Sequence, residues 1–187
     1  MINLAYKGSR KYIHITDIYN SLFYGKNYKK LDILFKKKIK NQPKFISKNL
    51  IKDKKIIQKA NCTISIIKKK IKHTILIYDS KKKVNIKYHY DEKSFYKFFK
   101  LTNKSCRCNF GTEMSSIEIL IALTKYFHIK KVKNCSWLFS KLILKSKLNE
   151  KKIKNFTIYL KKNYINMFTK LDIYQNKKYI GEIQFSN

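Results

Sequence analysis

Residues 115–129 constrain the fold more than any other segment, because they predict a helix that is apolar on nearly every side. Ser115 and Glu118 have the spacing of a capping box, in which each side chain satisfies a backbone N–H group of the first helical turn. The apolar residues that follow are Ile117, Ile119, Leu120, Ile121, Ala122, Leu123, Tyr126 and Phe127. Such a helix is buried rather than laid on a surface, so we expect the rest of the chain to surround it.

Alternating apolar and polar residues predict strands on both sides of this helix. The expected strands cover residues 11–15, 31–40, 62–70, 72–79, 84–90, 136–144, 156–162, 168–174 and 179–185. A second helix is expected to begin at Thr16, which is a good capping residue, and to stop at Gly25. Two acids at the start of residues 91–99 predict a third helix. Residues 44–58 and 101–110 are expected to be connecting segments.

The two halves of the chain share a layout, although they share almost no sequence identity. Each has a helix led in by a hydroxyl residue, Thr16 or Ser115, then a strand, and then three more strands that end in a hairpin. This pattern predicts an α+β fold with two units, residues 1–100 and 101–187, in one fused globular domain. A buried helix wrapped by an antiparallel sheet of about four strands, twice in one chain, resembles the tandem ("double") hot-dog fold superfamily.

Hot-dog proteins mostly handle acyl groups carried as thioesters on coenzyme A or acyl carrier protein. The resemblance therefore implies binding of such a thioester, or a dehydratase, thioesterase or acyltransferase-like activity in fatty-acid or polyketide biosynthesis. It places the site between the two units at the start of a central helix, where exposed N–H groups polarise the thioester carbonyl. The His-Phe-Pro-Gly motif of the dehydratases is absent, so the reaction type stays open. No cofactor is implied, apart from the phosphopantetheine that the substrate carries.

Residues 8–17 form the first of two polar segments that lead into a predicted helix. His14 is a candidate general base or carbonyl-binding donor, and Asp17 is a candidate to orient it. The alternative is that Asp17 favours the positive end of the helix and that His14 is a strand residue. Arg10 is a candidate to bind a carboxylate or phosphate, or else it is a surface strand residue.

Residues 109–118 form the second polar segment. Glu113 is a candidate catalytic acid or base beside the start of the buried helix. Ser115 is a candidate ligand-binding hydroxyl as well as a helix cap. The resemblance makes Arg107 a candidate to bind the phosphates of coenzyme A or of a carrier arm, and a solvated loop position is the alternative. Together with His14, Asp17 and Arg10, these residues make up the candidate site.

The net charge of +33 supports a second function, in which a basic protein, such as an organellar ribosomal component, binds RNA. Only two of the 44 basic residues are Arg, so the other 42 are Lys, whereas proteins that read nucleic acid use Arg heavily. Lys, Ile, Asn, Tyr and Phe have A/T-rich codons, so the bias of a very A+T-rich genome explains much of the excess. One contiguous basic face would favour RNA, and an even spread of lysines would favour codon bias.

The four cysteines predict free, buried thiols rather than disulfides or a metal site. Cys106 and Cys108 are closer than the usual zinc-binding pair, and no second CxxC or HxxxH pattern completes a set of ligands. No apolar stretch approaches the ~20 residues of a membrane span, and no secretion signal is recognisable. We therefore expect a cytoplasmic protein, bacterial or organellar, that is not secreted and is either a monomeric pseudo-dimer or a homodimer.

Overall fold

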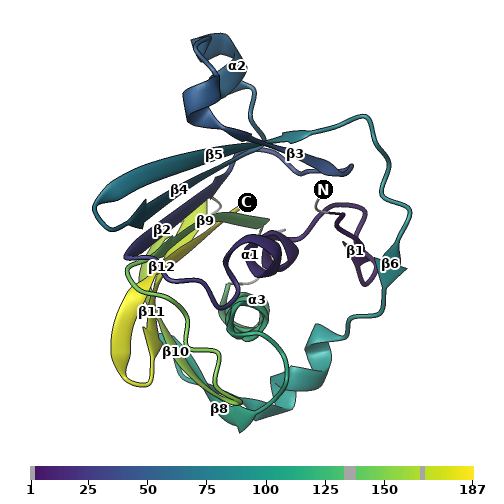
Figure 1. Ribbon diagram of the computed structural model, residues 1–187. Helices are drawn as coiled ribbons and strands as arrows, with labels where there is room; N and C mark the ends of the chain where they lie inside the picture. The colour runs from purple at the N-terminus through teal and green to yellow at the C-terminus, as the bar shows by residue number, and fades with distance from the viewer. Residues whose placement is uncertain (1–2, 133–137, 165–166) are drawn as a thin grey trace. The chain divides into compact units, whose positions relative to one another are not determined.

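The computed structural model describes residues 3–132, 138–164 and 167–187. The chain divides into two compact units, Met1–Tyr90 and Asp91–Asn187. Each unit combines helices with antiparallel strands (Figure 1). The α+β class predicted from the sequence is therefore confirmed.

Unit 1 contains an antiparallel sheet with the strand order β3-β5-β4-β2 and a separate ladder of β1 and β6, which are parallel. Its elements are β1 (Tyr6–Lys7), α1 (Ile15–Phe23), β2 (Lys30–Phe35), β3 (Pro43–Ser47), the 3-10 turn η1 (Lys48–Leu50), α2 (Lys54–Gln58), β4 (Cys62–Lys68), β5 (Ile71–Asp79) and β6 (Lys87–Tyr88). Lys69 and Lys70 both have positive φ in the turn between β4 and β5. This conformation is the one that joins two antiparallel strands by a tight two-residue turn.

Helix α1 begins two residues earlier than the sequence predicts. Its N-cap is His14, so Thr16 lies inside the first turn, where it is buried, and no strand forms over residues 11–15. The helix is amphipathic and packs Tyr19 and Phe23 into the core of the unit. Gly25 follows with a φ of 68°, the left-handed conformation that ends many helices, so the predicted stop is confirmed.

Unit 2 consists of one long helix and an antiparallel sheet with the order β9-β12-β11-β10-β8-β7. Its elements are the 3-10 helix η2 (Glu92–Phe98), β7 (Phe99–Leu101), β8 (Ser105–Gly111), α3 (Ser116–Lys131), β9 (Leu138–Leu144), β10 (Ile153–Tyr164), β11 (Phe168–Gln175) and β12 (Lys178–Ser186). Helix α3 contacts β8, β10 and η2 (Figure 1). The capping box of Ser115 and Glu118 is present.

The core of unit 2 consists of α3 and the side chains on one face of the sheet. Residues 119–124 are all buried, and six consecutive residues cover more than one full turn of a helix. The predicted helix with no exposed face is therefore confirmed over this stretch. The strands bury every second residue, namely Phe156, Ile158, Leu171, Ile173, Ile183 and Phe185.

Residues 101–110 do not form the connecting segment that the sequence predicts, because β8 occupies most of it. Cys106 and Cys108 are buried, while Arg107 and Asn109 are exposed. This alternation is that of a half-buried strand, and it was overlooked because the two cysteines were not counted as apolar residues. A free cysteine behaves as a small hydrophobic side chain.

Two predictions in unit 1 were also wrong. Residues 44–58 contain β3 and α2 rather than a connector alone, since β3 pairs with β5 and forms an edge of the sheet. The strand expected over residues 84–90 shrinks to β6, which pairs with β1 and not with β5. The order of elements does repeat between the units. The pairing does not, because β2 pairs with β4 in unit 1 whereas β9 pairs with β12 in unit 2.

We predict that Gly181→Ala strongly destabilises unit 2. Gly181 lies in β12 with a φ of 155°, and a Cβ atom there would lie 1.9 Å from the carbonyl oxygen of Ile143 on β9. Because the obstacle is backbone, the strands must separate, and we expect the free energy of unfolding to fall by about 3 kcal/mol. Gly111→Ala is the matched control, since a Cβ atom there meets nothing within 4 Å. Urea unfolding measures both variants, and equal losses would contradict the argument.

We also predict that His128 makes unit 2 sensitive to acid. Its Nδ1 lies 2.7 Å from the carbonyl oxygen of Thr124 and its Nε2 lies 2.5 Å from Oγ1 of Thr169. Burial lowers the pKa of this imidazole from 6.5 to about 4. Below pH 6.5 the His128 imidazole is protonated in the unfolded chain but stays neutral in the folded chain. The free energy of unfolding therefore falls as the pH is lowered from 6.5 towards 4.

The loss should reach about 3 kcal/mol in the free energy of unfolding between pH 7 and pH 4. His128→Gln removes the titrating group while keeping hydrogen-bonding atoms in place. Urea unfolding at pH 7, 5.5 and 4 should therefore show a shallower dependence on pH for His128→Gln than for the unmodified chain. The same dependence in both proteins would mean that other groups cause the acid sensitivity.

Candidate functional site

A buried lysine, Lys7, lies at the start of α1 in unit 1. Its side chain has no exposed surface, and its Nζ donates a hydrogen bond of 3.0 Å to Oγ1 of Thr16. Oδ1 of Asp17 is 3.7 Å from the same nitrogen. A charge is costly to bury unless it is paired and hydrogen-bonded. These two contacts with the first turn of α1 therefore help to keep the ammonium group inside the unit.

Two tyrosines, Tyr88 in β6 and Tyr90 just after it, complete the surroundings of Lys7. Tyr88 is the register partner of Lys7 in the ladder of β1 and β6, and its hydroxyl donates a hydrogen bond of 2.6 Å to Oδ1 of Asp17. The Nζ of Lys7 lies 4.1 Å from the ring centroid of Tyr90, which is a cation–π contact. Gly8 allows this approach, because a Cβ atom there would lie 3.2 Å from the carbonyl oxygen of Tyr90.

His14 joins the cluster through Thr16. The imidazole is 4% exposed, makes no capping hydrogen bond, and places Nδ1 2.9 Å from Oγ1 of Thr16. Since the ammonium group of Lys7 only donates, Oγ1 of Thr16 accepts from it and its own proton can be donated to Nδ1. This assignment places the ring proton on Nε2.

Arg10 lies at the edge of this cluster. Its Nη1 donates a hydrogen bond of 3.3 Å to the carbonyl oxygen of Lys7, and its guanidinium carbon lies 5.9 Å from the ring centroid of Tyr90. The structure therefore brings together the three candidates from the first polar segment, His14, Asp17 and Arg10. We call the set of Lys7, His14, Thr16, Asp17 and Tyr88 the α1 cluster.

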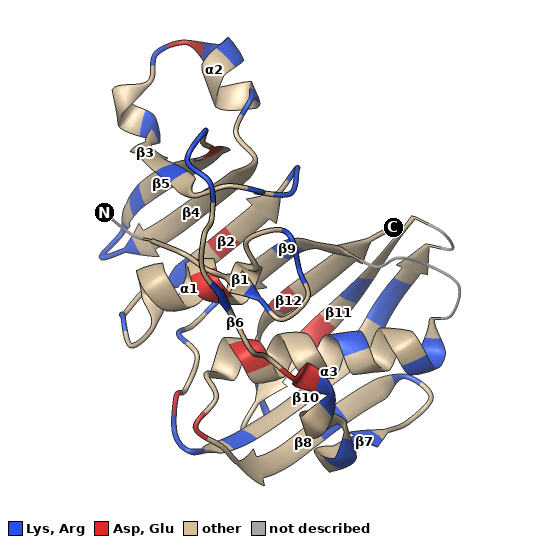
Figure 2. Cartoon of the chain, turned by 90° about the vertical axis from the view of Figure 1, so that its right-hand side faces the viewer, with Lys and Arg blue, Asp and Glu red and all other residues tan. Residues whose placement is uncertain are grey.

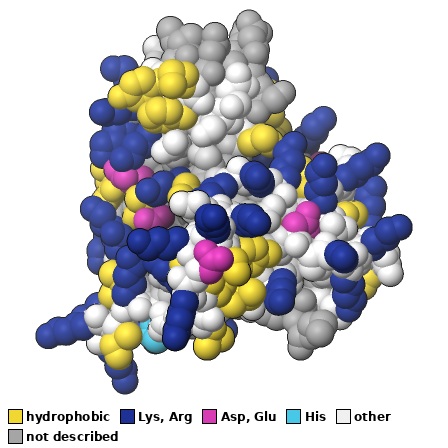
Figure 3. All heavy atoms as spheres, turned by 90° about the horizontal axis from the view of Figure 1, so that it is seen from above, with side chains coloured by type: hydrophobic (Ala, Val, Ile, Leu, Met, Phe, Trp, Pro, Cys, Tyr) yellow, Lys and Arg dark blue, Asp and Glu magenta, His cyan; other side chains and the backbone are white. Residues whose placement is uncertain are grey.

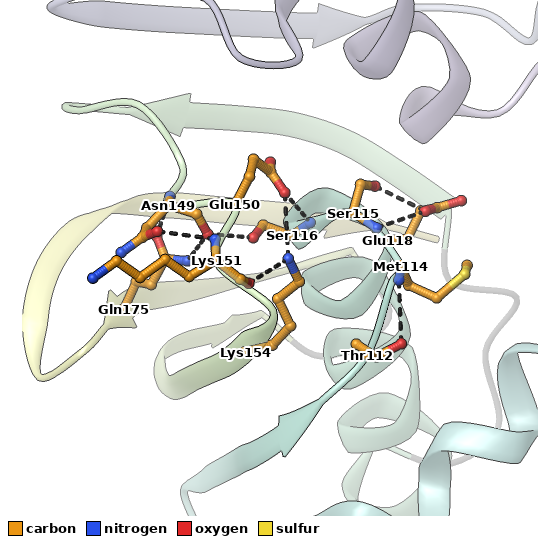
Figure 4. Close-up of polar contacts among 10 residues, drawn as sticks. All are labelled: Thr112, Met114, Ser115, Ser116, Glu118, Asn149, Glu150, Lys151, Lys154 and Gln175. Atoms are coloured by element: carbon orange, nitrogen blue, oxygen red, sulfur yellow. Dashed lines mark hydrogen bonds and ion pairs between the residues drawn. The ribbon is translucent and has the colours of Figure 1, made fainter.

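The start of α3 is filled by carboxylates of unit 2 itself (Figure 4). The backbone N–H and the hydroxyl of Ser115 donate to Oε2 of Glu118 at 3.0 and 2.8 Å. The backbone N–H of Ser116 donates to Oε2 of Glu150 at 2.7 Å. These carboxylates take the place that the resemblance assigns to a thioester carbonyl. Ser115 therefore acts here as a helix cap.

A second buried lysine holds Glu150 in this position. Nζ of Lys154 lies 3.6 Å from Oε2 of Glu150 and donates a hydrogen bond of 2.7 Å to the carbonyl oxygen of Lys151 (Figure 4). Asn149 and Gln175 exchange two hydrogen bonds of 2.8 Å, which fix the same loop to β11. Each unit thus has a buried lysine paired with an acid beside the first turn of its main helix.

The last two candidates, Glu113 and Arg107, lie on the surface. The side chain of Glu113 is 86% exposed and forms an ion pair of 3.1 Å with Lys152. Arg107 is exposed on β8, on the face of the sheet opposite to that of Cys106 and Cys108. Neither side chain is packed against the start of α3. They are therefore left out of the site that we build below.

Lys7, Tyr88 and Tyr90 were not found by sequence reasoning. Lys7 is one of 42 lysines, and Tyr88 and Tyr90 are two of 14 tyrosines, so residue type gave no signal. The only hint was Gly8, one of four glycines in a chain whose composition disfavours glycine. The ladder that brings Lys7 and Tyr88 together is only two residues long, which is too short to leave a periodic pattern.

The described cysteines are free and buried, as predicted. Burial raises the pKa of Cys106 to about 12 and that of Cys108 to about 11, and it also raises the pKa of Cys62. Such thiols stay protonated and unreactive. Cys135 lies outside the described residues. Among the residues that the structure describes, no group of three or more His, Cys, Asp or Glu side chains could hold a metal ion.

Comparison with known proteins assigns the chain to no family: no family model matches it, and no curated protein matches its sequence. Within the described ranges, no helix is long and apolar enough to cross a membrane. We therefore infer a function from the geometry of the α1 cluster and from the chemistry of its side chains.

We predict that Lys7 and Asp17 are energetically coupled. Lys7→Met should lower the free energy of unfolding by about 3 kcal/mol, because it leaves a partly buried carboxylate without the ammonium group. Asp17→Asn should also destabilise, and the double variant should lose at least about 1 kcal/mol less than the sum of the two. Urea unfolding of all four proteins gives the coupling energy. Lys72→Met, at an exposed position on β5, should change stability little, and strictly additive losses at positions 7 and 17 would disprove the coupling.

Proposed function

We propose that the protein binds an acyl thioester, carried on the phosphopantetheine of acyl carrier protein or coenzyme A, at the start of α1. The observation that carries the proposal is the hydrogen-bonded chain from Lys7 through Thr16 to His14. This chain favours an imidazole N–H donor at the positive end of a helix. Both the donor and the helix dipole stabilise the partial negative charge of a carbonyl oxygen.

The contrast with α3 supports the choice of α1. The first N–H groups of α3 already bond to Glu118 and Glu150. At α1 the N-cap side chain is His14, which makes no capping hydrogen bond. A ligand carbonyl at α3 would have to displace two carboxylates, whereas at α1 it would meet an imidazole that is suited to donate.

Each member of the α1 cluster has a part in this proposal. His14 donates its Nε2–H to the thioester carbonyl oxygen. Thr16 is a positioning residue that sets the tautomer of His14. Lys7 fixes the hydroxyl of Thr16, and Asp17 in turn holds Lys7. Polarisation of the carbonyl is the step that dehydratases, thioesterases and acyltransferases have in common, so the proposal specifies this step and no particular product. The net charge of +33 suits an acidic carrier protein as the partner.

The buried α3 and the repeated order of elements also fit two hot-dog-like units. The different strand pairing in unit 1 means that the two units are not copies of each other. Binding at α1 alone is consistent with this difference, because it involves only one of the two main helices.

The test compares two variants of Thr16, each of which changes one group of the side chain. Thr16→Val keeps the shape of the side chain but removes the hydroxyl, and Thr16→Ser keeps the hydroxyl. We expect Thr16→Val to weaken binding of an acetyl-pantetheine thioester about 10-fold, which corresponds to one lost hydrogen bond of about 1.4 kcal/mol. Thr16→Ser should bind within about two-fold of the unmodified chain. Isothermal titration calorimetry measures all three proteins.

Further variants separate binding from folding. His14→Ala should lose the same interaction as Thr16→Val, and the double variant should be no weaker than His14→Ala alone. Glu113→Gln alters an exposed acid and serves as the control, with no expected effect. If Thr16→Val and Thr16→Ser weaken binding equally, the tautomer argument is wrong. If the unmodified chain does not bind the thioester at millimolar concentration, the proposed function is wrong.

A further inference from the structure

The solvent-facing side of the unit 2 sheet carries three adjacent tyrosines. Tyr159 on β10 is 47% exposed, while Tyr174 on β11 and Tyr179 on β12 are half-buried. The ring centroids of Tyr159 and Tyr174 are 5.4 Å apart, and those of Tyr174 and Tyr179 are 5.5 Å apart. Their strand neighbours Ile158 and Ile173 are buried on the other side of the sheet. We call these three residues the tyrosine row.

A hollow of about 360 Å³ lies beside the tyrosine row. It is lined by Thr157, Tyr159, Tyr174 and Lys177. Small-molecule sites typically have volumes of about 300–1,000 Å³, so this hollow has room for one planar ring system with an aromatic wall. Lys177 belongs to the hairpin tip between β11 and β12 and has a φ of 65°, so its backbone position is set by the turn.

Cations lie around the tyrosine row. Nζ of Lys145 is 4.9 Å from the ring centroid of Tyr179, and Lys177 lines the hollow. Arg107 on β8 and Lys100 on β7 are register partners, and both are exposed. In the ladder of β8 and β10, Arg107 is the register partner of Thr157, which lines the hollow. One of the two arginines of the chain therefore lies on this face of the sheet.

The acids on this face are neutralised by lysines. Asp172 and Glu182 are register partners. Nζ of Lys161 lies 3.3 Å from Oδ1 of Asp172 and 2.8 Å from Oε1 of Glu182. Nζ of Lys170 lies 2.7 Å from Glu182. Two carboxylates matched by two ammonium groups leave no local negative charge that would repel a phosphate.

Overall charge does not single out this surface. Figure 2 shows Lys and Arg residues on many helices, strands and loops, and Figure 3 shows their side chains spread over the visible face rather than gathered in one place. Such a spread agrees with the codon bias inferred from the sequence. The feature that distinguishes this face of unit 2 is the combination of three tyrosine rings in edge-to-face contact, a hollow and flanking cations.

We propose that the tyrosine row binds single-stranded nucleic acid. Unpaired bases stack on the tyrosine rings, one base enters the hollow, and phosphates lie near Lys145, Lys177 and Arg107. Stacking on aromatic side chains accepts any base, because every base has a π-face. A duplex hides these faces, so it gains only the charge attraction. This surface goes beyond the proposed thioester function and uses no residue of the α1 cluster.

The first experiment measures stacking. A 5′-fluorescein-labelled 12-nucleotide oligouridine is titrated with the full chain at 150 mM salt, and fluorescence anisotropy gives the dissociation constant. Tyr159→Ala should weaken binding about 10-fold or more, since one stacked base contributes about 1–3 kcal/mol. Tyr159→Phe keeps the ring and should bind within about two-fold of the unmodified chain. Tyr24→Ala, at a tyrosine of unit 1 that is 52% exposed, is the matched control and should have no effect.

The second experiment measures phosphate contacts through the salt dependence of the same affinity. Lys177→Gln should reduce the slope of log affinity against log salt by about 0.7, the value for one phosphate contact on a single strand. Lys72→Gln, at an exposed lysine of unit 1, should leave the slope unchanged. Circular dichroism confirms that each variant is folded.

Three outcomes would overturn the proposal. Equal weakening by Tyr159→Ala and Tyr24→Ala would show that no particular tyrosine is used. Equal slopes for Lys177→Gln and Lys72→Gln would show diffuse charge attraction. Equally strong competition by a duplex or by polyglutamate would show that the surface binds any polyanion, an acidic protein included. His14→Ala should leave oligouridine affinity unchanged, so failure of this proposal is distinguishable from failure of the thioester proposal.

Discussion

A buried helix must satisfy its first backbone N–H groups inside the core, and the start of α3 in unit 2 is arranged around this requirement. In unit 2 the partners are the carboxylates of Glu118 and Glu150, and Lys154 compensates the charge of the second. The carboxylates also match the positive end of the helix dipole. Breaking this arrangement would leave a buried charge without its partner, which is far more destabilising than never having had the pair. The start of α3 is therefore a fixed part of the fold.

The start of α1 in unit 1 has different chemistry. There the acid nearest the helix start, Asp17, accepts a hydrogen bond from Tyr88 and lies beside Lys7, while the N-cap position is taken by an imidazole. A histidine has two distinct nitrogens, so fixing one through Thr16 determines what the other can do. The two helix starts therefore differ in chemistry although they are similar in layout. At the start of α3 the carboxylates of Glu118 and Glu150 cap the helix. At the start of α1 the hydroxyl of Thr16 instead orients the imidazole of His14.

The parts of the fold that follow from local chemistry were predictable from the sequence. The burial of residues 119–124, the capping box and the stop at Gly25 all depend on side chains within a few positions of one another. The parts that depend on distant partners were not. The register of Lys7 with Tyr88 joins residues far apart in the chain through a ladder of two residues, which has no pattern of its own. The strand at Cys106 was missed for a different reason, since its alternating pattern is present only when the two cysteines are counted as apolar residues.

Position is more informative than composition in a chain with such a strong bias towards lysine. Lysine has A/T-rich codons, and a bias towards such codons would add lysines wherever solvent tolerates them, so an exposed lysine alone carries little information about function. Such a bias does not account for Lys7 and Lys154, because a lysine inside a core is retained only where an acid and hydrogen-bond acceptors are already in place. Tyr159 is also informative through its position. Its ring is exposed to solvent on β10, beside the ring of Tyr174. A function is best inferred from residues whose positions codon bias does not explain, such as a lysine in a core or an exposed tyrosine beside other rings.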